Sequence, residues 1–547
     1  MASTVPEKII LPQKYYLDYF RYLLDFVQLH YRHVLSDQDY EFIQSFSNLS
    51  EPGQCLFVRF SNRKGPMYRV RQLAYEEIPD PEAAAQELVE MGFAHRNIPN
   101  APESFNLFTR RELFTIFDKE VATLKRQLKV EIIEHLMGAE DAYLQLDEYE
   151  PIVHVDKQDE FEYFKLLFFG QYKAQMTEFV IRDVGHVKLE SLKEDQFKPW
   201  CNNRDEAMAF FEVSKLKTLI RKAIKVWPAT VVHEEIIDTD WAAFRQYERS
   251  AKALDTLALE LGQQLEREGE KELALAYYQW SLKPPARERQ IRILDSLKRT
   301  EEASALARKL LDNYRNANER IFASDFLNRK AVRINRSMSS KLAESPVIQL
   351  EDNPDLRVEH QVMEHFAERG FQAIHSENFL WRNLFGLLLW EELFDQGQDG
   401  FHHPLQRATS DLHTPLFFEK RREFIQKKMA KLNSRQKIIR RLKGTAKQKQ
   451  GLANPMVYWY EGLLEHCEAL VEKLYPAQLK AVVLEQCKNI KDNSTGFPDL
   501  FIWNEQEYFF YEIKSPNDHL SAQQLFWIEF MQNQGIRADI LRVQYSR

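Results

Sequence analysis

The chain has 547 residues, of which 29% are charged and 44% hydrophobic, and its formal net charge is −8. This length provides for three or four domains, and the composition is typical of a globular protein. The four cysteines lie far apart without a CxxC pair, which argues against a disulfide framework and against a zinc finger. No apolar run reaches the length of a membrane-spanning helix and the first ten residues lack a signal-peptide core, so we expect an intracellular protein without a membrane anchor.

The N-terminal segment combines a predicted core helix with a basic cluster. Apolar residues recur at helical spacing from Tyr16 to Tyr31, which predicts a helix with one buried face. The stretch RFSNRKGPMYR then surrounds a Gly-Pro turn in what reads as a β-like segment, with aromatic residues between the basic ones. This mixture suits a duplex backbone or an unpaired base, and it is equally compatible with an ordinary surface. The candidate DNA contacts are Arg59, Arg63, Lys64 and Arg69.

Helical patterns fill the middle of the chain. After the polar linker RNIPNAPESF, Thr109 and Glu112 form a capping box that opens a helix. Between residues 195 and 345, small residues at contact positions, Gly269 between two helices and a closing Pro284-Pro285 predict helical hairpins of tetratricopeptide type, of which barely two are recognisable. Such an array bridges domains or binds a protein partner; the alternative is an α-helical spacer.

A strongly basic stretch shows that charge is segregated along this acidic chain. Residues 419–450 carry about a dozen lysines and arginines against two glutamates, a bias that sequence-independent phosphate binding uses. The alternative is a solvated helical face with Phe424, Ile425 and Met429 packed on the other side. A nucleic-acid-binding protein would use the same stretch as a DNA contact.

A β-hairpin is predicted near the C-terminus. Residues 500–503 and 508–513 are β-branched and aromatic runs, and the polar tetrapeptide 504–507 separates them. With these four residues as the turn, Phe501 faces Phe510 and Asp499 faces Glu512, with Cβ atoms roughly 4.5 to 5.5 Å apart. We also expect a helix capped by Ser521 and Gln524, a final strand ADILRVQYS, and an upstream strand QLKAVVLEQC.

The opposed carboxylates of this hairpin predict a metal site. Asp499 and Glu512 would repel each other, whereas a divalent cation between them would be coordinated by both. Lys514 shares the face of Glu512 and can neutralise charge on a phosphate or position a water. Taken singly, a Pro-Asp turn and a Glu-x-Lys edge pair are ordinary structural features. Their combination in register favours a hard metal ion.

The same residues carry a family resemblance. Pro498-Asp499 followed by Glu512-Ile513-Lys514 resembles the PD-(D/E)xK nuclease core, and GFPDLFIWN with EIKSPND is similar to its virus-type replication-repair nuclease branch. The segments YYLDYFRYLLDFVQLHY, CLFVRFSNRKGPMYRV and HSENFLWRNLFGLLLWEELF extend the resemblance to the Fanconi-associated nucleases, structure-specific enzymes of interstrand-crosslink repair, over nearly the whole chain.

The resemblance implies a multidomain α+β protein with four modules. We expect a winged-helix-like DNA-binding domain at 1–98, a SAP-like DNA-binding domain at 99–194, a TPR-like helical domain at 195–348, and an α/β restriction-endonuclease-like nuclease domain at 349–547. The SAP-like module would grip duplex DNA. Its candidate phosphate contacts, each equally an ordinary surface residue, are Arg110, Arg111, Lys125, Arg126 and Lys129.

Further site residues follow only from the resemblance. It implies that Glu377 is a third metal-binding carboxylate, that Gln406 lies beside the metals, and that the Ile513 carbonyl is a ligand. Sequence spacing alone leaves three comparable glutamates open: Glu461, Glu465 and Glu485. Gln523 stands where family members place an extra phosphate-binding lysine, and Lys491 would keep part of that pocket.

The resulting hypothesis is hydrolysis of a DNA phosphodiester with Mg²⁺ or Mn²⁺ held between Asp499, Glu512 and Glu377. Water would attack in line, oriented by Lys514. The resemblance implies 5′-flap endonuclease and 5′-to-3′ exonuclease activity on branched or flapped DNA. The alternatives are a Holliday-junction resolvase and a non-catalytic scaffold. Because the cysteines of a ubiquitin-binding finger are missing, the chain resembles bacterial members, with no ubiquitin binding expected and the bacterial cytoplasm or nucleoid as its location.

Overall fold

The computed structural model describes residues 11–96, 101–139, 141–185, 187–331, 337–351, 353–398 and 400–546. The chain divides into two compact units. The first comprises residues 1–186 and 198–211, and the second comprises residues 187–197 and 212–547. None of the described helices is long and apolar enough to cross a membrane.

Among its described residues, the first unit contains ten complete helices, the start of α11 and a small antiparallel sheet. The predicted N-terminal helix is confirmed: α1 buries Phe20, Leu23 and Val27 on one face. The sheet order is β1-β3-β2, so the segments predicted as the first and second modules share one sheet. The elements are α1 (Tyr15–His30), α2 (Asp37–Asn48), α3 (Glu51–Ser61), β1 (Met67–Arg69), α4 (Pro81–Glu90), β2 (Ala94–His95), α5 (Pro102–Asn106), α6 (Arg110–Ile116), α7 (Lys129–Met137), α8 (Ala142–Tyr149), β3 (Ile152–Val155), α9 (Gln158–Phe169) and α10 (Thr177–Asp183).

The capping box predicted at Thr109 and Glu112 is present and opens α6. Helices α5 to α8 close around a separate apolar cluster that includes Phe105, Leu113, Ile132 and Leu146. The short helices therefore form a folded insertion between strands β2 and β3.

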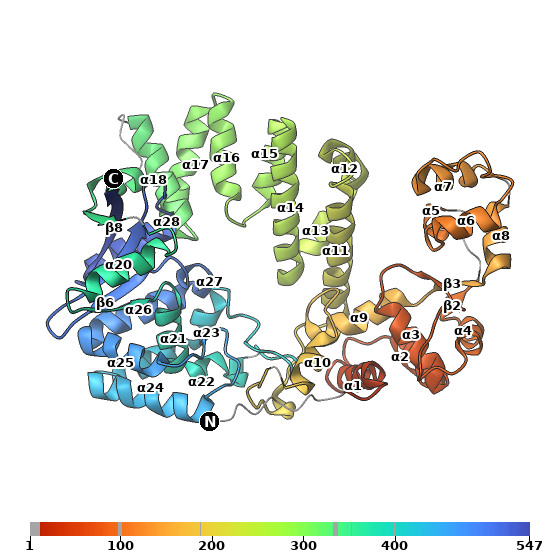
Figure 1. The fold of residues 1–547 in the computed structure, drawn as a ribbon, viewed down its shortest axis with the longest axis horizontal. Coiled ribbons are helices and arrows are strands. Elements are labelled where there is room, and N and C mark those ends of the chain that lie inside the picture. The colour runs from red at the N-terminus through yellow and green to blue at the C-terminus, as the bar shows by residue number, and fades with distance from the viewer. Residues whose placement is uncertain are drawn as a thin grey trace. The chain divides into compact units, whose positions relative to one another are not determined.

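A stack of antiparallel helices occupies the middle of the chain, as predicted. Neighbouring helices from α14 to α18 lie side by side in Figure 1. Gly269 ends α14 in the left-handed conformation that glycine adopts without strain, and Gly262 lets the ring of Tyr278 approach the helix backbone. The elements are α11 (Arg204–Ala223), α12 (Ala229–Ile236), α13 (Trp241–Arg245), α14 (Glu248–Glu268), α15 (Lys271–Trp280), α16 (Ala286–Ser296), α17 (Thr300–Asp312), α18 (Ala317–Ala331) and α19 (Ser337–Glu344), preceded by the 3-10 helix η1 (Glu194–Gln196).

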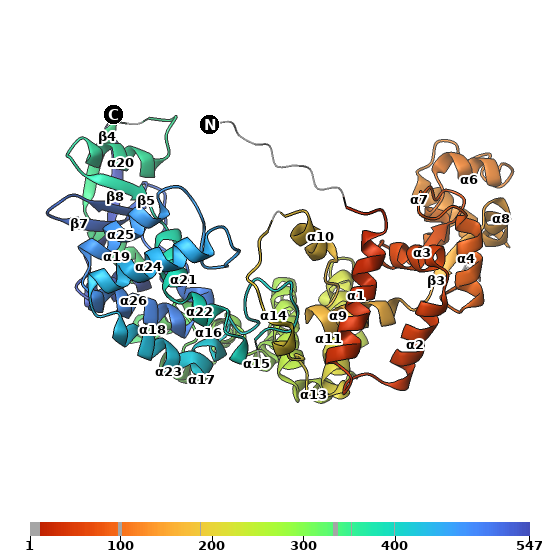
Figure 2. The same cartoon turned by 90° about the horizontal axis from the view of Figure 1, so that it is seen from below.

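The C-terminal part is built on a mixed five-stranded sheet with order β4-β8-β7-β6-β5. Strands β4, β5, β7 and β8 are labelled in Figure 2. Strand β8 pairs in parallel with β4 and β7, whereas β6 pairs antiparallel with β5 and β7. The predicted hairpin register is confirmed, since Phe501 pairs with Phe510 and Trp503 with Tyr508. The strands are β4 (Val347–Glu351), β5 (Gln372–His375), β6 (Leu500–Trp503), β7 (Tyr508–Lys514) and β8 (Ala538–Ser546).

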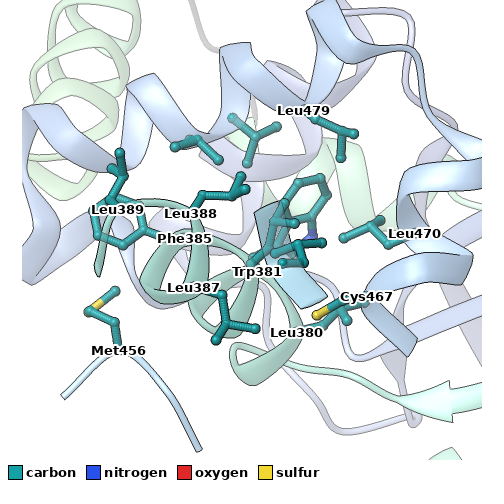
Figure 3. Close-up of a cluster of buried hydrophobic side chains, with 14 of the residues drawn as sticks. Leu380, Trp381, Phe385, Leu387, Leu388, Leu389, Met456, Cys467, Leu470 and Leu479 are labelled. Atoms are coloured by element: carbon teal, nitrogen blue, oxygen red, sulfur yellow. The ribbon is translucent and has the colours of Figure 1, made fainter. Parts of the chain in front are cut away.

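Helices pack against this sheet, and helices and sheet together enclose a large apolar cluster. Trp381 lies at the centre of the cluster in Figure 3, with Leu388, Leu470 and Leu479 gathered around it. The helices are α20 (Val358–Ala367), α21 (Phe379–Leu388), α22 (Trp390–Leu393), α23 (Leu416–Lys431), α24 (Arg435–Lys449), α25 (Leu463–Lys473), α26 (Pro476–Lys488), α27 (Ile490–Asn493) and α28 (Ala522–Asn533), with the 3-10 helix η2 (Gln396–Gln398).

The strand predicted for QLKAVVLEQC is wrong, because this segment lies in helix α26. Its buried residues, Leu479, Val482, Val483 and Gln486, follow the helical spacing i, i+3, i+4, i+7. Pro476 in the first turn suits a helix start. The two adjacent valines misled the prediction, since packing of the helix against the domain core overrides their preference for strands.

Candidate active site

The predicted hairpin positions Asp499 at the end of three neighbouring strands. The Ile513 N–H of β7 donates to Asp499 Oδ2 at 2.8 Å. On the other side, the N–H groups of Ser376 and Glu377, which follow β5, donate to the Asp499 carbonyl oxygen at 2.7 and 2.9 Å. The backbone thus fixes Asp499 and brings Glu377 beside it.

Glu512 and Lys514 point from β7 into a buried polar pocket. Only 1% of Glu512 and 7% of Lys514 are exposed. Lys514 Nζ lies 2.9 Å from Glu512 Oε1, and the Gln524 side-chain amide donates to the same oxygen. The second carboxylate oxygen, Oε2, is buried without a hydrogen-bond partner among the described residues. A buried carboxylate oxygen without a protein partner fits a cation ligand.

The electrostatics of the two carboxylates point the same way. Burial, followed by the neighbouring charge of Asp499, raises the pKa of Glu512 from its ordinary value of 4.5 to about 8. Burial also raises the pKa of Asp499, although the hydrogen bond from the Ile513 N–H and the charge of Lys514 lower it in part. Two buried carboxylates that resist ionisation are stabilised by a cation between them. The oxygen donors of Asp499, Glu512 and the Ile513 carbonyl suit a hard divalent ion.

Glu377 occupies an unusual backbone conformation next to Asp499. Its φ of 31° lies in the positive region that residues other than glycine rarely adopt, a form of strain that clusters at functional sites. The side chain is exposed and accepts from Asn378 Nδ2 at 3.1 Å. Of the alternatives left open by the sequence, Glu485 forms an ion pair with Lys488 at 2.6 Å. Glu377 stays the predicted third carboxylate because its backbone N–H contacts Asp499 directly.

Gln406 is engaged by its own loop. Its side-chain oxygen accepts from the N–H groups of His402 and His403, and its amide nitrogen donates to the carbonyls of Gly400 and Ala408. These bonds fix the loop from residue 400 to 408. The role of Gln406 beside a metal stays a prediction.

Sequence reasoning missed two side chains that act on the site. Gln524 was recognised only as a capping residue, yet its oxygen accepts from both Ser521 N–H and Lys514 Nζ, at 2.9 and 3.3 Å. Glu359 in α20 is close enough for its charge to raise the pKa of Asp499. A carboxylate on the helix before β5 carries no local motif, so only the fold could reveal Glu359.

The basic cluster near the N-terminus separates into paired and exposed residues. The prediction of a β-like stretch is confirmed only for Met67–Arg69, which form β1, whereas the residues up to Ser61 belong to α3. Arg69 is buried and pairs with Glu112 and Glu150, which argues against the predicted DNA contact. Arg59 pairs with Glu77. Arg63 and Lys64 are exposed and remain candidate contacts.

The other predicted DNA contacts also differ in exposure. Arg110, Arg111, Lys125, Arg126 and Lys491 are exposed, whereas Lys129 is half-buried and donates to the Asn106 carbonyl at 3.1 Å. In the basic helices α23 and α24, much of the charge is used internally, as in the buried pair of Arg421 with Asp411 at 2.8 Å. The residues exposed on these helices include Arg422, Lys427, Lys431, Lys437, Arg440 and Lys447.

Comparisons with known proteins agree with this architecture. The family "FAN1, HTH domain" matches residues 14–95, and the "VRR-NUC domain" family matches residues 433–545, a range that includes Asp499, Glu512 and Lys514. The Fanconi-associated nuclease 1 homolog of Pseudomonas aeruginosa is 28% identical over 97% of this chain and 96% of its own length. Human Fanconi-associated nuclease 1 is 30% identical over 34% of this chain and 19% of its own length.

A solved structure is similar over the same extent. The crystal structure of paFAN1 bound to 2nt 5′flap DNA with gap superposes with a TM-score of 0.83 at 27% identity, covering 98% of this chain and all of that chain. Fold and site together define a structure-specific DNA nuclease with a VRR-NUC catalytic domain, a domain that implies a divalent metal requirement. The chain is similar to Fanconi-associated nucleases over nearly its whole length, and it matches the FAN1 HTH and VRR-NUC domain families.

Proposed function

We propose that this nuclease cuts flapped double-stranded DNA near the 5′-flap junction and degrades DNA from 5′ to 3′, in the repair of interstrand crosslinks in the bacterial cytoplasm or nucleoid. The observation that carries the catalytic part is the buried Asp499–Glu512 pair with its orphaned oxygen. The substrate class is supported by the likeness to paFAN1, whose solved structure contains 5′-flap DNA.

The residues of the pocket suit Mg²⁺ or Mn²⁺. The carboxylates of Asp499, Glu512 and Glu377 and the carbonyl of Ile513 would hold the ion, since both metals prefer oxygen ligands. When bound, the ion polarises the phosphate and lowers the pKa of water. Recruitment through ubiquitin is no part of this proposal.

Lys514 is the residue that faces the reacting phosphate. In the pocket, contacts with Glu512 and Gln524 hold its ammonium group in a fixed position, so the four-carbon side chain is not free to move. A cation fixed before the reaction needs no reorganisation as charge develops on the phosphate oxygens. We assign Lys514 to water orientation and charge stabilisation, and Gln524 to positioning Lys514 and Glu512.

The exposed basic residues supply the sequence-independent part of DNA binding. Arg63 and Lys64 lie in one exposed turn, and Arg110, Arg111, Lys125 and Arg126 lie on and after α6. Contacts of this kind go to phosphates, and they weaken as salt rises.

The test is cleavage of end-labelled 5′-flap, 3′-flap, four-way-junction and plain duplex DNA with Mn²⁺, Mg²⁺ or EDTA. The parent protein is compared with Glu512→Gln and with Glu505→Gln, which makes the same chemical change at the exposed turn of the same hairpin. We expect metal-dependent cutting near the 5′-flap junction that Glu512→Gln loses and Glu505→Gln keeps.

Two controls separate the alternatives. Asp499→Ala should bind flapped DNA with nearly unchanged affinity while losing cleavage; loss of both binding and folding would make Asp499 structural. Symmetric cutting of the four-way junction would instead identify a resolvase. Binding without cleavage under every metal would favour the scaffold.

A further inference from the structure

A second cluster of metal-ligating side chains lies in the first unit, far along the chain from the nuclease residues. His95 is in β2, His154 is in β3, and Asp156 directly follows β3. Their donor atoms all lie within 4.8 Å of one another. The cysteine pattern of the sequence gave no sign of such a site, because its ligands are imidazoles and a carboxylate.

The sheet explains why the three side chains converge. His95 and His154 are directly paired across antiparallel strands, so their side chains share one face. Asp156 is two residues beyond His154, which returns it to that face. The Asp156 N–H donates to the Phe93 carbonyl at 2.8 Å and continues the ladder. The backbone therefore fixes all three positions.

The contacts within the cluster are incomplete at His154 Nδ1. His95 Nδ1 lies 2.8 Å from Asp156 Oδ2, a hydrogen bond. His154 Nδ1 lies 3.5 Å from Asp156 Oδ1 and is buried without a hydrogen-bond partner among the described residues. The two rings lie 4.5 Å apart between centroids. Burial and the adjacent His95 lower the pKa of His154, whereas Asp156 raises it.

We propose that His95, His154 and Asp156 bind one divalent transition-metal ion, with water completing the coordination. Two imidazoles and a carboxylate are the donor set of zinc sites that keep an open position. A tetrahedral zinc ion holds such ligands roughly 3.3 Å apart, which rotation of these partly exposed side chains provides. The ion takes the place of the proton that His95 and Asp156 share.

The donor set separates this site from the nuclease pocket. Imidazole nitrogens favour zinc, nickel and copper ions, whereas Mg²⁺ takes oxygen ligands in an octahedron. The ion would join β2 to β3 and so close the insertion of helices α5 to α8 at its base. The site goes beyond the proposed nuclease function and does not depend on it.

The test is equilibrium dialysis of the full chain against ZnCl₂ with Mg²⁺ in excess, followed by metal analysis. All proteins carry Glu512→Gln, so that the nuclease pocket contributes little. We expect one zinc per chain. His154→Ala and the isosteric Asp156→Asn should weaken binding by at least about a hundredfold, whereas the control His135→Ala, at an exposed histidine of α7, should not.

Two further readouts do not depend on the variants folding. Co²⁺ bound in place of zinc should give the visible absorption of a low-coordinate nitrogen site. In the Glu512→Gln protein without a further substitution, zinc should protect His95 and His154, but not His135, from modification by diethylpyrocarbonate, as mapped by mass spectrometry. Absence of tight zinc binding in the parent, equal binding in all variants, or equal labelling of the three histidines would overturn the proposal.

Discussion

The raised pKa of Glu512 makes metal binding depend on pH in a defined direction. A carboxylate coordinates a metal only after it has lost its proton. Because the pKa of Glu512 lies at about 8 in the metal-free fold, the carboxyl is protonated near neutrality and must release that proton on binding. The apparent affinity for Mn²⁺ should therefore rise with pH and level off above about pH 8.

The magnitude follows from the same value. Below the pKa of Glu512, each decrease of one pH unit lowers the metal affinity about tenfold, which corresponds to about 1.4 kcal/mol of binding free energy. The affinity should rise about fiftyfold between about pH 6 and pH 8, and about a hundredfold between about pH 6 and the plateau. Asp499, whose pKa is raised by burial, adds to this dependence at the acid end.

Isothermal titration of the metal-free protein with MnCl₂ measures both the affinity and the released proton, from the heats in buffers of different ionisation enthalpy. We expect about one proton per metal near pH 6 and nearly none at about pH 9. An affinity that stays constant across this range would refute the reasoning, because Glu512 would then already be ionised. Glu505→Gln is the matched control and should retain the full pH dependence.

Two further substitutions test the structure. Arg69→Met should destabilise the first unit by about 3 to 5 kcal/mol, because it leaves Glu150 buried without its partner. The control Arg71→Met, at the exposed pair with Glu82, should change stability by less than about 0.5 kcal/mol. Urea unfolding followed by circular dichroism measures both, and equal effects would contradict the structural role of Arg69. Gly386→Ala should destabilise the nuclease domain by about 1 to 3 kcal/mol, because the new Cβ would lie 2.5 Å from Val457 Cγ2. The control Gly444→Ala in α24 meets no atom within 4 Å and should stabilise the domain slightly. Thermal melting measures both, and an unchanged melting midpoint for Gly386→Ala would show that the core rearranges around the added methyl group.

The catalytic hairpin could be predicted because its information is local. A four-residue polar turn between two aromatic runs fixes the register, and the register alone brings Asp499 to Glu512. The capping box at Ser521 and the final strand were equally readable. Each of these depends on residues close together in sequence.

The features that the sequence could not reveal depend on distant segments. Arg69 seemed to be a surface cation until the fold buried it against Glu112 and Glu150, residues from a separate part of the first unit. The convergence of His95 with His154 requires the pairing of β2 with β3 across the helical insertion. The segment of helix α26 is predicted as a strand because its adjacent valines favour strands, although its buried residues recur at helical spacing.

The catalytic pocket illustrates a conflict between stability and function. Below its folded-state pKa, Glu512 keeps a proton that the unfolded chain releases above about pH 4.5, so the metal-free fold loses stability as pH rises from there to about pH 8. Glutamine at position 512 would avoid this loss and could still accept the hydrogen bond from the Gln524 side-chain amide. It cannot, however, supply an anionic ligand. The positive φ of Glu377 adds strain at the same place. A sequence that accepts a buried carboxylate, an orphaned oxygen and a strained backbone within one pocket is best explained by the cation that would relieve the first two.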